Sequence, residues 1–187
     1  MKSNLEKIFK RVKEKKTFFL ILIIILLIFF IYLNLIKQIL FSAIIIAIAS
    51  ITKIYHKFIK TTLSIDLIFF STLLICFAYK NFILSITFSL IGLIIADYLA
   101  QKLNQNTLIS AFTLILTILF FNLLNSLKID IIIIAIFLML LYEILASFLY
   151  NLIGSSKDKI VLFFISHFLT NLFLILNYLK QILELIS

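Results

Sequence analysis

Long apolar runs without proline decide what this chain can fold into. Residues 17–36 carry no charge, and several later runs of fifteen or more residues are almost as apolar. About 20 apolar residues span the hydrocarbon core of a bilayer as a helix. Inside lipid only helices and closed barrels satisfy the backbone, and barrel strands would alternate polar with apolar residues. The continuous runs therefore predict an all-α fold, a polytopic transmembrane helix bundle.

The composition excludes a soluble globular domain. The chain is 64% hydrophobic with a mean hydropathy of +1.26, whereas soluble domains are about 45–50% apolar. The expected partner is therefore the lipid bilayer. The net charge of +9 is interpreted as a signal of membrane orientation and not of nucleic-acid binding.

The apolar runs predict about seven helices, a six-helix core plus one N-terminal helix. A basic cytoplasmic segment, residues 1–16, is expected to precede a transmembrane domain, residues 17–187. Asn34 and Lys37 mark the only break between the first two runs. The predicted helices cover residues 17–36, 38–52, 64–79, 81–101, 108–127, 131–153 and 160–179.

The lysines and the arginine indicate how the helices cross the membrane. With seven crossings and the N-terminus inside, thirteen of the seventeen cations lie on the inner side and four on the outer side. Cytoplasmic loops carry the excess of Lys and Arg. We therefore expect a multi-pass protein of the cell membrane with a cytoplasmic N-terminus and an external C-terminus.

Four polar residues within or near the apolar runs are candidates for a functional site: Glu143, His167, Asn171 and Asp97. Ionisable groups inside a membrane are costly and face protein or water more often than lipid. The tight turn at residues 154–159 makes the last two helices antiparallel, so we expect Glu143 to meet His167 or Asn171. Structural hydrogen bonding between helices and a cluster that holds a ligand, a proton or a partner helix are both consistent with the sequence.

Small residues mark candidate helix-packing positions. Ala43, Ala47 and Ser50 fall on one face of an early helix, and Gly92 lies inside a later one. Small side chains let two helices approach closely. We expect this face to pack within the protein, with docking of a partner as the alternative.

The sequence contains no recognisable enzyme motif. The sequence has no serine or cysteine nucleophile beside a base at a recognisable spacing, and no cluster with metal-ligand spacing. His56 lies in a basic loop and is expected to be solvated. We therefore expect a protein without catalytic residues, metal or cofactor.

Three segments resemble the rod-shape-determining membrane protein MreD. The first begins at Asp66, passes a polar break at residues 79–81 and ends with Gly92 and Asp97; the second contains Glu143 and the third contains Asn171. The resemblance implies a non-enzymatic scaffold that links the cytoskeletal and wall-synthesis parts of an elongation complex. Other membrane proteins would then be its partners.

The chain is also similar to the substrate-binding subunits of energy-coupling-factor vitamin transporters. Those subunits carry an Ala-x-x-x-Ala face for docking the coupling subunit, and Ala43 and Ala47 fit that pattern. This resemblance implies a bound small molecule. Scaffold and transport subunit thus stand as two hypotheses.

Overall fold

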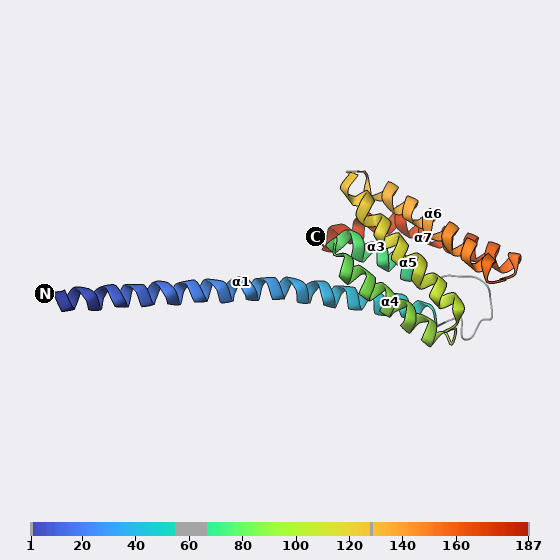
Figure 1. Cartoon of the computed structure of the whole chain (residues 1–187). Helices are drawn as coiled ribbons and strands as arrows, with labels where there is room; N and C mark the ends of the chain where they lie inside the picture. Colours follow the sequence, from blue (N-terminus) through green and yellow to red (C-terminus); the bar gives the residue numbers. More distant parts are fainter. Residues whose placement is uncertain (1, 55–66, 128, 187) are drawn as a thin grey trace. The chain divides into compact units, whose positions relative to one another are not determined.

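A computed structural model describes residues 2–54, 67–127 and 129–186. It is helical, as predicted, and it divides into two compact units, residues 1–40 and 41–187. The described part contains six α-helices and a short 3₁₀ helix, η1, shown in Figure 1: α1 (Lys2–Thr52), α3 (Ile68–Tyr79), α4 (Phe82–Leu99), α5 (Gln105–Leu124), η1 (Asn125–Leu127), α6 (Ile131–Leu152) and α7 (Lys157–Ile186).

Within these residues, five helices are long and apolar enough to cross a membrane, which makes the chain a multi-pass membrane protein. The shorter α3 is the exception, with 12 residues. At 1.5 Å per residue it is about 18 Å long, less than the hydrocarbon thickness of about 30 Å. All residues from Ile68 to Phe77 are buried, so α3 forms the centre of the bundle and does not face lipid.

The four following helices surround α3. Helix α4 packs on α5, α5 on α6 and α6 on α7, and all four contact α3. Short turns join them, which makes consecutive helices antiparallel. Asn81 and Asp130 begin α4 and α6 by accepting hydrogen bonds from the backbone N–H groups of Leu84 and Ile132. The core therefore lies along α3, and the outward faces of the other helices are apolar.

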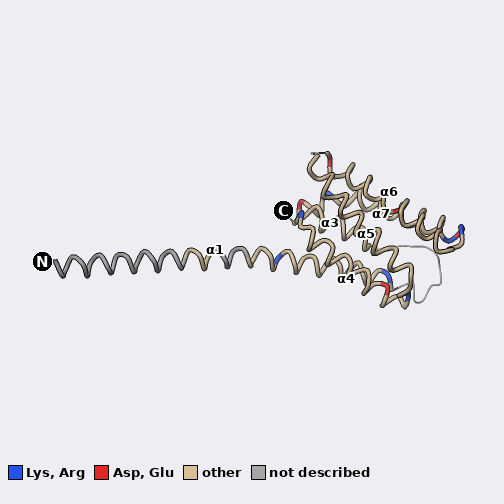
Figure 2. The backbone as a smooth tube through the Cα atoms, viewed as in Figure 1, with Lys and Arg blue, Asp and Glu red and all other residues tan. Residues whose placement is uncertain are grey.

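This connectivity gives the second unit two distinct ends. At the basic end lie Lys53, the α4–α5 turn and the α6–α7 turn, because Lys53 contacts Asp97 and Ser110 contacts Tyr150. At the opposite end, which we call the Asp130 end, Asp130 contacts Lys180. In Figure 2 the charged residues of α3–α7 gather mainly at the helix ends. Glu143, well inside α6, is the exception.

The predicted break at Asn34 and Lys37 is wrong, because α1 is helical throughout Lys2–Thr52. Neither residue removes a backbone donor or needs a left-handed backbone, and only proline or glycine would do so here. A polar residue between two apolar runs therefore does not by itself end a helix. The predicted loop residue His56, the predicted helix start at residue 64 and Asp66 lie outside the described residues.

The expected packing face of α1 is also wrong in part. Ala43 and Ala47 are exposed, whereas Ser42, Ile46, Ala49 and Ser50 are buried. The reason lies on α4, where a Cβ on Gly92 would stand 2.6 Å from Ile46 Cγ2. Gly92 thus supplies the close approach, and a large side chain of α1 fills it. The small-residue pattern on α1 does not reveal which helix provides the groove.

Candidate functional site: a buried carboxyl, imidazole and amide

The centre of the candidate site is Glu143 on α6. The buried face of α6 follows a helical stripe that includes Leu138, Met139, Tyr142, Glu143 and Ala146. Glu143 lies on this stripe and has 0% of its surface exposed. Its helical position, set by the apolar pattern around it, therefore turns the carboxyl away from lipid and toward α7.

The opposing helix supplies an imidazole and an amide. The buried residues of α7 are His167, Asn171, Ile175 and Leu179, spaced four residues apart and so on one helical face. His167 is 1% exposed and Asn171 is 0% exposed. Two polar residues and then two apolar ones thus face the bundle in order along α7.

The structure brings Glu143, His167 and Asn171 together, as the antiparallel arrangement led us to expect. His167 Nδ1 contacts Glu143 Oε1. The Asn171 Nδ2 group donates to the His167 backbone oxygen at 2.9 Å and lies 3.2 Å from His167 Nδ1. The carboxyl and the imidazole are thus in hydrogen-bond contact and can share one proton between them.

Aromatic rings enclose the imidazole. Phe163 stacks on His167 with ring centroids 5.3 Å apart, and Tyr142 lies 5.4 Å away at a tilt of 34°. Phe69 of the central helix α3 completes the enclosure, with its ring centroid 6.1 Å from that of His167. Aromatic faces stabilise a cation over them, so this enclosure tolerates the imidazolium as well as the neutral imidazole. The arrangement is chemically suited to holding a proton.

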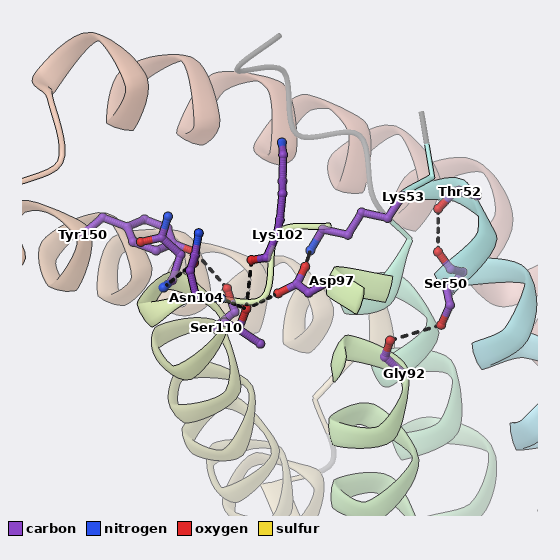
Figure 3. A network of polar contacts seen from close by, with 12 residues as sticks. Ser50, Thr52, Lys53, Gly92, Asp97, Lys102, Asn104, Ser110 and Tyr150 are labelled. Atoms are coloured by element: carbon purple, nitrogen blue, oxygen red, sulfur yellow. Dashed lines mark hydrogen bonds and ion pairs between the residues drawn. The ribbon is translucent and has the colours of Figure 1, made fainter. Parts of the chain in front are cut away.

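Asp97 does not belong to this cluster, which corrects its assignment. Its carboxylate accepts a hydrogen bond from Thr107 Oγ1 at 2.6 Å through Oδ2 and pairs with Lys53 Nζ at 2.8 Å through Oδ1 (Figure 3). Asp97 lies two residues from the end of α4, so its partners come from the basic end. Its role there is to tie the end of α1 to the α4–α5 turn.

Lys102 stands beside this ion pair. Figure 3 shows its side chain extending away from Asp97 while that of Lys53 reaches the carboxylate. Partial burial, and then the charge of Lys53, lower the pKa of Lys102, and the Asp97 charge offsets part of this shift. The basic end thus carries more positive charge than Asp97 alone neutralises.

Two further contacts between helices were not predicted. Ser110 Oγ and Tyr150 Oη lie 2.8 Å apart, and Ser50 Oγ donates to the Gly92 carbonyl at 3.1 Å. Tyr150 follows Glu143 by seven residues and so shares its helical face; that spacing was the available signal. Ser50, predicted as a packing residue, lies at a close contact between α1 and α4.

Metal ligands do not gather among the described residues, where no group of three His, Cys, Asp or Glu side chains lies together. The chain matches no protein-family model, no curated protein and no solved structure. The interpretation of the site therefore rests on its own geometry.

Proposed function

We propose that this protein is a non-enzymatic membrane scaffold of the MreD kind, located in the cell membrane and bound to other membrane proteins of a wall-elongation complex. The observation that supports it is the inward orientation of the residues that carry the resemblance. Asp97 is 5% exposed, and Glu143 and Asn171 are both 0% exposed. These polar groups hold the bundle together and leave apolar helix faces for lipid and for partner helices.

The alternative is a small-molecule-binding subunit of an energy-coupling-factor type transporter. One observation favours it: Ala43 and Ala47 are exposed on the part of α1 that belongs to the second unit. An exposed pair of small residues four apart permits the close approach of another helix. Under this hypothesis the occupant is the transporter's coupling subunit.

Crosslinking in living cells separates the two functions. A photoreactive residue at Ala47 should capture membrane proteins of the wall-elongation complex, and the same residue at Ile133, which is 61% exposed on α6, serves as a lipid-facing control. Capture of an ATPase-associated membrane subunit at Ala47, together with a small molecule carried through purification, would instead support the transporter. If the residue at Ala47 captures neither class of protein more than the residue at Ile133 does, both proposals are contradicted.

We also propose that the basic end faces the cytoplasm. Among the described residues it carries Lys53, Lys102, Lys157 and Lys159, whereas the Asp130 end carries Lys80 and Lys180. A membrane-impermeant maleimide should therefore label Asp130→Cys in intact cells and leave Lys157→Cys unlabelled; the single native cysteine, Cys76, is buried. The reverse labelling would invert the orientation.

The side of the membrane on which the N-terminus lies is tested by a separate labelled cysteine. Residues 17–52 form a helical stretch whose length of about 54 Å exceeds the hydrocarbon core of about 30 Å. Because α1 is helical throughout Lys2–Thr52, two crossings and the cytoplasmic N-terminus expected from the sequence would require α1 to turn back within the membrane, and Ser3→Cys would then behave like Lys157→Cys. External labelling of Ser3→Cys would mean a single crossing and an external N-terminus.

A further inference from the structure

A line of hydroxyl groups leads from Glu143 toward the basic end. Ser147 follows Glu143 by four residues and Tyr150 follows Ser147 by three, so the three side chains are neighbours on one face of α6. Ser147 Oγ is buried and has no hydrogen-bond partner among the described residues. Tyr150 Oη in turn lies 2.8 Å from Ser110 Oγ on α5, near the start of that helix.

The same helix faces are apolar on the other side of Glu143. Toward the Asp130 end, α6 buries Met139, Leu138 and Ala135, each 0% exposed. Beyond Asn171, α7 buries Ile175 and Leu179, also 0% exposed. Along α6 and α7, a proton on Glu143 therefore meets hydroxyl groups in one direction and apolar side chains in the other.

We propose that Glu143 and His167 form an intramembrane proton-binding site that exchanges its proton with water at the basic end through Ser147, Tyr150 and Ser110. The proton lies on the carboxyl or on the imidazole, and in either case the pair is neutral, which is the state that a membrane interior tolerates. This inference does not depend on the scaffold proposal, because a scaffold and a transport subunit could both contain such a site.

Transfer along the line conserves protons at every step. Each hydroxyl accepts a proton on a lone pair and releases its own to the next group. Because Ser147 Oγ has no hydrogen-bond partner among the described residues, a bridging water molecule on either side would link it to Glu143 and to Tyr150. Ser110 releases it to water one helical turn from Thr107, whose hydroxyl donates to Asp97. No bond other than O–H and N–H bonds forms or breaks.

Among the residues that the structure describes, few other titratable or charged groups bear on the site. Tyr142 of α6 faces His167, and α3 contributes the uncharged Phe69. The contact from α5 to the path is the hydroxyl of Ser110. At the water-facing end stand Asp97, paired with Lys53, and Lys102. Proton exchange at the site should therefore report on Glu143 and His167 themselves.

The test uses the two histidines of the chain, His56 and His167. In the full-length protein in lipid nanodiscs with ¹⁵N-labelled histidine, His56→Gln assigns the remaining signals to His167. Transfer from H₂O to D₂O then gives the exchange rate of the proton shared with Glu143. Tyr150→Phe and Ser147→Ala should each slow this exchange by about tenfold or more, as expected for removal of a proton-transfer group.

Two matched variants serve as controls. Tyr98→Phe removes a phenol that is 69% exposed, and Ser126→Ala removes an exposed hydroxyl that donates to the Leu123 carbonyl at the end of α5; both should leave the rate unchanged. If Tyr150→Phe disturbs folding, Ser147→Ala decides the test, since Ser147 Oγ has no partner to lose among the described residues. Equal exchange rates in Ser147→Ala, Tyr150→Phe and the two controls would overturn the proposal.

Discussion

The two halves of the second unit hold their helices together in different ways. Toward the basic end, side chains bond across helices: Lys53 with Asp97, and Ser110 with Tyr150. Toward the Asp130 end, Thr117 bonds to the carbonyl of Thr113 in its own helix, and Leu138 is packed among apolar side chains with 0% exposure. In the interior, one half is held by polar pairs between helices and the other by close packing; the Lys180–Asp130 pair of the second half is exposed.

The difference shows which interactions hold the helices together at each depth of a membrane protein. Apolar contact between helices gains little from the hydrophobic effect, because lipid is as apolar as leucine. Packing alone therefore holds the Asp130 half through dispersion and shape. In the basic half several polar groups find partners on another helix, which fixes the register of the helices and places Glu143 beside His167.

Among these substitutions, replacing Glu143 by leucine should lower the free energy of unfolding most. Glu143→Leu leaves the buried imidazole of His167 without the carboxyl, at a cost of about 1–3 kcal/mol for a buried group that loses its partner. Glu143→Gln keeps a donor and an acceptor and should fold nearly as well. Unfolding in mixed micelles measures both, with the lipid-facing Ile144→Leu as control; equal stability of all three variants would contradict the comparison.

Removing packing from the apolar half should have a smaller effect. Leu138→Ala leaves a cavity and should cost about 2 kcal/mol, at the low end for soluble proteins because the unfolded leucine also contacts lipid. The exposed Leu152→Ala, at 64% exposure, is the matched control. The same unfolding measurement applies, and a loss at Leu138 no greater than at Leu152 would show that packing does not hold this half.

The exposed ion pair at the Asp130 end should matter least. The hydrogen bond from Lys180, and then the Ile132 N–H, lower the pKa of Asp130 below its ordinary value of 3.8. A lowered folded-state pKa stabilises the protein above the ordinary value, and this stabilisation is lost as the pH falls through the folded-state pKa. Asp130→Asn should therefore slightly lower stability at neutral pH and abolish the loss that the native protein shows as the pH falls below 3.8. A large loss at neutral pH would contradict this ranking.

The sequence predicted the helices and one of the polar contacts for clear physical reasons. Lipid forces long apolar runs to be helical, and the α6–α7 turn forces Glu143 and His167 to comparable depths. The packing face of α1 depended on the groove at Gly92, which lies 46 residues after Ile46. The partner of Asp97 was Lys53, 44 residues earlier. Neither spacing follows from local periodicity, so only the folded bundle reveals these contacts.

The central claim is that Glu143 and His167 act as a pair across α6 and α7, and a double-mutant cycle tests it directly. Unfolding free energies are measured for Glu143→Leu, His167→Phe and the double variant, with phenylalanine keeping the ring against Phe163. The account predicts that the double variant loses less than the sum of the single losses, with a coupling of about 0.5–3 kcal/mol. Losses that add to within about 0.3–0.5 kcal/mol, as for independent sites, would contradict it.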